Sequence, residues 1–483
     1  MKRFWLVMLS LGLVLAFSAS AMAVDVKFSG SFYAAGMYLD KTTFMNTTAT
    51  SGAGGGSDNV STAFYFQRLR VKTDFIVSPG LSLVTRFDAM ERAWGAPRST
   101  AAANSSEFSS APKLDAGSSG TVPENENIAF DLAYIQWVSP VGVFQVGYVN
   151  DGQWGTQFGD SDGTIGKIQW ILPVGPAMFT AYVGKVTEYS KTAKLTTGGN
   201  ATTSLTDGDT DKYVLTATYN VNKDISVGFL YAYQRIAQFK SATTPLAGVP
   251  AFGALGASPA LIKAHVANPY AKAKFGPVSL EAEVDYTFGK VNYENNYDRD
   301  ISIGMLSAYI GAMVDLGPVY FGGKFAYISG DDPTTSDKWE GGQIGGGYDW
   351  NPTLIMFNRE RTYWAGGLPG WNSTSADNSS GLLGACGMTN AWFGQGIIGG
   401  RPIAALDIQA SLAYAAADQK PSGVLNGAYG WEIDVTGTYK ITNNLSYMLG
   451  VGYFFTGDYF KGNLNTQDIR NDYLLINKLT LTF

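Results

Sequence analysis

Apolar and polar residues alternate along many short stretches of this chain. In the last eleven residues, 473–483, Leu475, Leu479, Leu481 and Phe483 alternate with Lys478, two threonines and other residues. The same period of two runs through residues 279–289, 407–414 and 431–440. Because successive side chains of a β-strand point to opposite faces, each stretch predicts a strand with an apolar face and a polar face.

Two kinds of connection alternate between these predicted strands. Short turns containing Pro, Gly or Asn are predicted at 78–80, 139–142, 173–176, 220–223, 276–277, 317–318, 400–402 and 442–444. Long polar connections are predicted at 40–59, 93–126, 151–162, 190–210, 240–260, 291–301, 331–388, 417–427 and 459–470. Eight short turns and nine long connections join 18 strands, an even number, which is typical of a membrane barrel with turns on one side and long loops on the other.

The predicted fold class is therefore all-β: a transmembrane antiparallel up-and-down β-barrel of about 18 strands. An additional hairpin from Gln343 to Tyr363 would raise the count to 20, and loss of the weak strand from Met388 to Ile398 would lower it to 16. A soluble sandwich is the alternative. It does not account for so many strands with carboxylates in register on one face, and only a closed sheet lets strands meet lipid without unsatisfied edges.

The amino-terminus predicts export. Lys2 and Arg3 precede an apolar run over 4–17, and Ala21-Met22-Ala23 is a small-x-small cleavage site. Residues 1–23 are therefore a predicted cleaved signal peptide, and 24–483 a single barrel. The composition agrees, with 58 Gly, 27 Tyr and 27 Phe and a mean hydropathy of −0.02, as expected when each strand shows one face to lipid and one to water.

Charge and reactive residues exclude several function classes. The net charge is −6, and no basic patch with interleaved aromatic residues predicts nucleic-acid binding. Cys386 is the lone cysteine, so the sequence predicts no disulfide framework, no cysteine metal cluster and no cofactor. The acidic run Asp207-Gly-Asp209-Thr-Asp211 lacks the glycine and the final acidic residue of an EF-hand. The single histidine, His265, has no flanking nucleophile motif, so we predict that the chain is not an enzyme.

Charged residues on the polar strand faces are the first candidate functional group, because these faces line the interior of such a barrel. The predicted pore-lining residues are Arg68, Arg70, Lys72, Asp74, Arg86, Asp88, Glu281, Glu283, Asp285, Glu432 and Asp434. One hypothesis is a pore with separate positive and negative walls, whose transverse field sorts solutes by charge. The alternative is that these are solvated positions paired across strands for stability.

The longest connection, 331–388, is the second candidate. Its predicted constriction residues are Asp331, Asp332, Asp337, Glu340, Arg359 and Arg361. The apolar stretch from Thr353 to Phe357 is unusual for a loop in water, which indicates that part of this connection folds inward or packs on the barrel rim. An inward loop would narrow the pore.

With its export signal, alternating strands and terminal Phe483, the chain resembles the Gram-negative outer-membrane porin superfamily over residues 24–483. A narrower resemblance, to the alginate-export-like barrels, rests on the segment from Phe325 to Asp332, on Thr389-Asn390 and on the strand from Leu406 to Tyr414. The alginate exporter of that family has an arginine-lined pore, for which Arg68, Arg70 and Arg86 are candidates. Glu281, Glu283 and Asp285 depart from that pattern.

These resemblances imply an outer-membrane location in a Gram-negative bacterium, contact with outer-membrane lipid, recognition of Phe483 by the barrel-assembly machinery, and a possible homotrimer. The predicted function is a porin, a passive diffusion channel for small hydrophilic solutes and ions. The alternatives are a substrate-specific or polysaccharide-exporting barrel, and a structural barrel that sheathes an electron-transfer partner.

Overall fold

The computed structural model describes residues 24–41, 44, 61–95, 128–160, 163–188, 208–237, 260–293, 300–342, 344, 350–365, 388–420, 424–461 and 468–483. The predicted signal peptide, residues 1–23, and Cys386 lie outside the described residues. The strands are β1 (Asp25–Leu39), β2 (Thr62–Ser78), β3 (Leu81–Ala93), β4 (Ile128–Ser139), β5 (Gly142–Asp151), β6 (Gly163–Val174), β7 (Ala177–Thr187), β8 (Thr210–Asn222), β9 (Ile225–Ile236), β10 (Ala260–Phe275), β11 (Val278–Tyr293), β12 (Ile301–Asp315), β13 (Val319–Ile328), β14 (Lys338–Trp339), β15 (Ala391–Ile403), β16 (Leu406–Ala416), β17 (Ala428–Lys440), β18 (Leu445–Thr456) and β19 (Asp472–Thr482). The described helices are α2 (Arg359–Ala365) and the 3-10 turn η1 (Asp458–Lys461).

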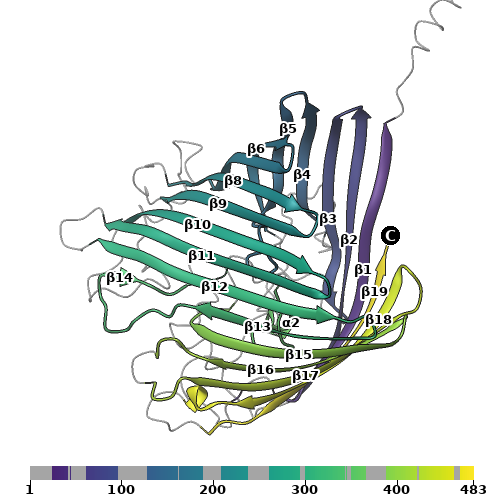
Figure 1. Cartoon of the computed structure of the whole chain (residues 1–483), viewed down its shortest axis with the longest axis vertical. Coiled ribbons are helices and arrows are strands. Elements are labelled where there is room, and N and C mark those ends of the chain that lie inside the picture. The colour runs from purple at the N-terminus through teal and green to yellow at the C-terminus, as the bar shows by residue number, and fades with distance from the viewer. Residues whose placement is uncertain are drawn as a thin grey trace, which may run out of the picture.

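The strands form one closed antiparallel sheet. Each long strand pairs with the next along the chain, and β19 pairs back onto β1, where Ala34 lies opposite Leu479. The sheet has 19 strands, and β14 is a two-residue strand that pairs in parallel with the edge of β12, so 19 − 1 = 18 strands make the barrel wall. The beginning of β1 and the carboxy-terminus lie at the same end of the barrel (Figure 1). The predicted antiparallel barrel of about 18 strands is confirmed.

Both alternative strand counts are wrong. In the described part of the segment from Gln343 to Tyr363, residues 350–358 contain no strand and Arg359–Ala365 is helical, so no barrel hairpin forms there. Asn358 explains the helix, since its side-chain oxygen accepts the Arg361 N–H at 2.8 Å and so caps the first turn. The strand at 388–398 does form, as β15, and it pairs with β13 and β16 on its two sides.

The short turns fall close to their predicted positions, and one differs. Gly317 adopts a φ of 89°, a backbone conformation that glycine enters without steric cost, in the predicted turn before β13. The turn predicted at Gly400–Pro402 lies instead at 404–405, because β15 continues to Ile403. Pro402 has no N–H to give to the ladder, and it sits in the irregular pairing between Gly400 and Ile403, where none is needed.

The outer and inner faces of the sheet differ in chemistry. Large apolar side chains on the outer face are exposed, for example Phe28 at 66%, Leu215 at 60% and Ile398 at 63%. The alternate residues face the interior and include most of the charged residues discussed below. No helix in the described parts of the chain is long and apolar enough to cross a membrane.

The interior is partly occupied by two chain segments. Residues 152–160 connect β5 to β6, and residues 350–365 include α2, which lies within the ring of strands in Figure 1. Phe158 of the first segment and Trp350 of the second are buried, with ring centroids 5.1 Å apart. We call these two stretches the interior segments. The predicted long connections at 151–162 and 331–388 thus both contribute residues to the inside of the barrel.

Candidate functional site

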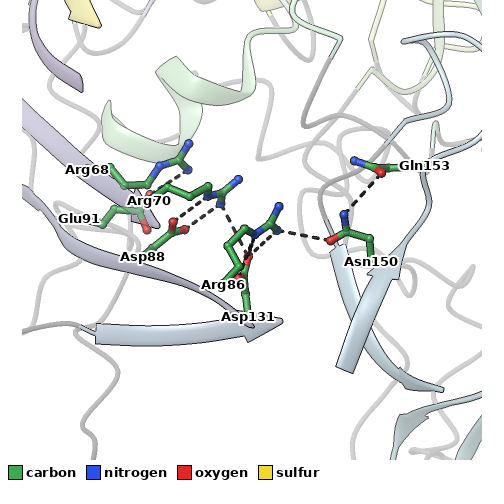
Figure 2. Close-up of polar contacts among 8 residues, drawn as sticks. All are labelled: Arg68, Arg70, Arg86, Asp88, Glu91, Asp131, Asn150 and Gln153. Carbon is green, nitrogen blue, oxygen red and sulfur yellow. Dashed lines mark hydrogen bonds and ion pairs between the residues drawn. The ribbon is translucent and has the colours of Figure 1, made fainter. Parts of the chain in front are cut away.

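Three arginines and three carboxylates form a network on the inner face of β2, β3 and β4 (Figure 2). Arg70 donates two hydrogen bonds to Asp88, at 2.7 Å and 2.8 Å. Arg86 binds Asp131, with its Nη2 2.5 Å from one carboxylate oxygen. Arg68 and Glu91 are 3.6 Å apart. We call these six residues the arginine network.

The network continues through weaker contacts to β5 and the first interior segment. Arg70 Nη2 is 3.9 Å from Asp131, so this carboxylate lies between two guanidinium groups. Arg86 also donates to the Asn150 side chain at 3.5 Å, and Asn150 donates to Gln153 at the same distance. Gln153 belongs to the first interior segment, so Figure 2 shows a continuous polar path from the wall to that segment.

The sequence predicted part of this network and missed the rest. Arg68, Arg70, Arg86 and Asp88 were predicted on the polar faces, whereas Glu91 and Asp131 were not. Asp131 lies at an irregularity in the pairing of β3 with β4, between the partners of Arg86 and Phe87, so simple alternation does not place it. The three cations are each paired with a carboxylate, as the alternative of cross-strand pairing predicted.

Lys72 and Asp74 continue the inner face of β2 toward the short turns. Their side chains are 3.2 Å apart along the strand, and the cross-strand partner of Lys72 is Arg86. Like charges placed directly opposite each other destabilise a sheet pair, so Asp74 offsets the repulsion between Lys72 and Arg86.

A second charged group, absent from the sequence prediction, lies on β5 to β8. Asp151 accepts hydrogen bonds from the Lys212 ammonium at 2.7 Å and from the Tyr182 hydroxyl at 2.5 Å. Lys167 lies 3.9 Å from the same carboxylate, and its ammonium stacks 4.2 Å from the centroid of the Tyr182 ring. Two lysines thus share one carboxylate on this part of the inner face.

The predicted acidic residues of β11 bind the first interior segment and side chains of the two neighbouring strands, β10 and β12. Glu283 is 1% exposed, and it accepts the Thr156 backbone N–H at 2.5 Å and an Asn268 N–H at 3.0 Å. Asp285 accepts a hydrogen bond from the same Asn268 amide. Glu281 accepts the Tyr309 hydroxyl at 2.5 Å. This wall therefore anchors backbone and side chains and does not present three free carboxylates to solvent.

The predicted acidic pair of β17 anchors the second interior segment. Glu432, which is fully buried, accepts the N–H groups of Ile355 and Met356 at 2.6 Å and 2.7 Å. Asp434 accepts the Leu354 N–H at a longer 3.4 Å. Because this segment is neither strand nor helix at 351–357, its N–H groups need acceptors from elsewhere, and the wall carboxylates supply them.

Helix α2 is held against β2 and β19. Trp364 stacks on Phe66, with ring centroids 4.5 Å apart. Lys478 donates to Glu360 at 2.6 Å. The predicted constriction residue Arg361 is 1% exposed, and burial lowers its pKa to about 10 despite the attraction of nearby carboxylates. The neighbouring Arg359 contributes its backbone N–H to Asn351, at 2.7 Å.

The four predicted acidic constriction residues lie in a separate turn over 331–340. Asp331 accepts the Glu340 N–H at 2.7 Å, and burial raises its pKa. The N–H and hydroxyl of Thr334 stabilise charged Asp332 and lower its pKa. The Asp337 carbonyl accepts an N–H from β12. In the described residues these acids bind within their own turn and to the barrel edge, while Arg359 and Arg361 lie on α2.

The lone histidine lies on the outer face. The ring nitrogen Nδ1 of His265 is 2.7 Å from the Tyr231 hydroxyl, and the imidazole stacks on Phe288 at 5.2 Å. Among the described residues, no group of three or more His, Cys, Asp or Glu side chains is arranged to hold a metal ion.

Comparison with known proteins gives a fold and no sequence relative. The sequence matches no family model, and no curated protein matches it. The structure of Pseudomonas aeruginosa OccK2 (OpdF) in complex with glucuronate superposes with a TM-score of 0.50 at 9% identity, covering 95% of this chain and 97% of that chain. The outer membrane protein opdK from Pseudomonas aeruginosa gives 0.48 at 11% identity, covering 95% of this chain and 99% of that one. A BenF-like porin from Pseudomonas fluorescens Pf-5 gives 0.47 at 10% identity, with the same coverage.

Proposed function

We propose that the chain is an outer-membrane channel through which small hydrophilic solutes and ions diffuse passively. The observation that carries this proposal is the chemistry of the two faces of the closed sheet. Exposed apolar side chains cover the outside, as contact with lipid requires, and paired charges line the inside. A closed sheet leaves no unpaired strand edge in the membrane.

Two features of the interior support a restricted channel over a wide one. The interior segments fasten to two separate strands of the wall, at Glu283 on β11 and Glu432 on β17. The arginine network lies on β2 to β4 and carries hydrogen-bonding groups suited to anionic or polar solutes. A substrate-selective channel is therefore the second candidate function, and the OccK2 (OpdF) structure, which holds glucuronate, suggests a probe.

Reconstitution in a planar bilayer tests the channel proposal. The mature barrel is expected to give discrete conductance steps, and liposome swelling is expected with small sugars. Glucuronate and glucose, compared in the same assay, separate the two candidate functions. Equal rates support general diffusion, and faster glucuronate entry supports selectivity. A correctly inserted barrel that conducts neither ions nor sugars would refute both and favour a structural role.

The arginine network gives a sharper test. Replacing Arg86 by Gln leaves Asp131 with less compensation, so the interior becomes more negative and the reversal potential in a salt gradient shifts toward cation selectivity. Lys223→Gln, in an exposed short turn, is the matched control because it removes one positive charge away from the network. An equal shift in both variants would show that the network does not control selectivity.

The proposed oligomer is a homotrimer, as in many porins. Electrophoretic mobility before and after boiling tests it. A detergent-resistant trimer migrates at the mass of three chains before boiling and at the mass of one chain afterwards.

A further inference from the structure

A row of cations crosses the outer face of the barrel near the long-loop ends of β9 to β12. Arg235 lies opposite Lys263, Lys263 opposite Lys290, and Lys290 opposite Ser302. Ser302 in turn pairs with Lys338 of β14. We call Arg235, Lys263, Lys290 and Lys338 the exterior cation row.

The alternation of each strand places this row outside the barrel. Arg235 shares a face with Phe229, which is 49% exposed, while the adjacent Ile236 is buried. Lys263 and Lys290 are exposed, and their neighbours Ile262 and Val291 are buried inside. In β14, Lys338 is exposed and Trp339 is buried against the inner face of the same strands.

The two lysines in the middle of the exterior cation row are not neutralised by a carboxylate of the described residues. In the described part of the chain, neither the Lys263 nor the Lys290 ammonium has an ion pair or hydrogen bond. Carboxylates lie at the two flanks, where Asp211 is 3.8 Å from Arg235 and Glu340 is 3.8 Å from Lys338. Directly opposed lysines in an antiparallel pair have Cα atoms roughly 5 Å apart, and like charges there destabilise the sheet. An anion bound between them would remove this cost.

Aromatic side chains lie on the same outer face, two residues along each strand from the exterior cation row and away from the long loops. Tyr233, His265 and Phe288 are consecutive neighbours across three strands, with ring centroids 5.0 Å and 5.2 Å apart. Tyr286 stacks on Phe288 at 5.6 Å. Membrane barrels carry such aromatic girdles at the level of the lipid headgroups. Cations directly above a girdle therefore lie at the depth of headgroup phosphates.

We propose that the exterior cation row binds the phosphate-bearing headgroup of an outer-leaflet lipid, with Lys263 and Lys290 as its central contacts. The inference rests on the proposed membrane placement, in which long loops face outside. The lysines provide the charge, and the aromatic rings below them pack against the upper acyl chains. The lipid thus relieves a like-charge contact that the sheet alone leaves in place.

The test uses the full barrel in detergent micelles and purified lipid A as the probe. The double variant Lys263→Gln/Lys290→Gln is expected to bind lipid A about 30-fold more weakly, which is the combined contribution of two basic residues near an anionic membrane surface. The control Lys223→Gln/Lys440→Gln removes the same charge from exposed positions at the short-turn end and is expected to bind as the parent does. The charge-preserving variant Lys263→Arg/Lys290→Arg is expected to retain binding.

Several outcomes would overturn the proposal. Equal lipid A affinity in the parent and the Gln variant would do so. The proposal would also fail if the Gln variant lost as much affinity for enzymatically dephosphorylated lipid A as for intact lipid A. Inorganic phosphate that binds the parent as tightly as lipid A would indicate a free-anion site. A Gln variant that loses an oligomer while keeping its lipid affinity would make the row a contact between copies. Heat-modifiable mobility and bilayer conductance, measured on the same samples, report folding and channel function independently of lipid binding.

Discussion

The hydrogen bonds of Glu432 offer the most direct way to perturb the second interior segment. The Glu432→Gln change keeps the shape of the side chain but replaces one acceptor oxygen by an amide N–H donor. Ile355 and Met356 both direct N–H groups at this position, at 2.6 Å and 2.7 Å, so the variant satisfies one of them and opposes the other.

The magnitude follows from these contacts. A typical hydrogen bond contributes about 0.5–1.5 kcal/mol, and a buried N–H left without an acceptor costs about 1–3 kcal/mol. A combined loss of about 3 kcal/mol would raise the population of the detached segment by roughly 150-fold. Phe357 adds to this tendency, because its φ of 51° is unfavourable for an aromatic residue and persists only while the neighbouring contacts hold it.

Single-channel recording measures the effect. The variant is expected to spend more time in a higher-conductance level, with frequent transitions, and a protease is expected to cleave within 350–365 sooner than in the parent. Asp407→Asn is the control, because Asp407 binds Tyr320 at 2.6 Å and contacts neither interior segment among the described hydrogen bonds. Unchanged noise and unchanged proteolysis in Glu432→Gln would refute the idea that this carboxylate holds the segment.

Three further changes test neighbouring contacts. Gly159→Ala is expected to displace the first interior segment, because a Cβ there would lie 2.1 Å from a Glu283 oxygen, and hydrogen exchange of residues 152–160 should increase. Because the pKa of Asp332 is lowered, its hydrogen bond to Thr334 stabilises the 331–340 turn fully at pH values above the ordinary aspartate pKa, and this stabilisation is lost as the pH falls through the lowered pKa. The Thr334 amide chemical shift should report this titration, and Asp332→Asn should abolish it. Trp364→Ala removes a ring that is 4% exposed and is expected to weaken the seating of α2 by about 3 kcal/mol, measured by protease cleavage within 350–365.

The wall of the barrel was predictable because its signal is local. Alternation with a period of two identifies a strand and its two faces without knowledge of its partner, so Arg70 and Asp88 could both be assigned to the polar face. Their pairing could not be derived from the short turn, because the register shifts by one residue between Ile76 and Ser78, and this shift places Arg70 opposite Asp88. Asp131 escaped prediction because a long connection and an irregular pairing separate it from Arg86, and neither can be derived from alternation.

The interior segments were harder to predict because their partners are distant in sequence. Glu432 was assigned correctly to a polar face, but its partner Ile355 lies 77 positions earlier in the chain. Thr156 and Glu283 are separated by 127 positions. The apolar stretch from Thr353 to Phe357 did indicate that part of the long connection folds inward or packs on the rim. Nothing in the sequence pattern indicated that residues 152–160 would do the same.

The buried carboxylates Glu283 and Glu432 differ from the arginine network in what they bind. Glu283 and Glu432 each accept backbone N–H groups, so their carboxyl oxygens hold the two interior segments. The arginine network pairs side chain with side chain, and Arg86 remains beside the polar path through Asn150. Changes to Glu283 or Glu432 should therefore alter gating noise with little effect on reversal potential, and changes to the arginine network should do the opposite. If both kinds of change altered both quantities equally, the interior would act as one electrostatic unit and this division of roles would be wrong.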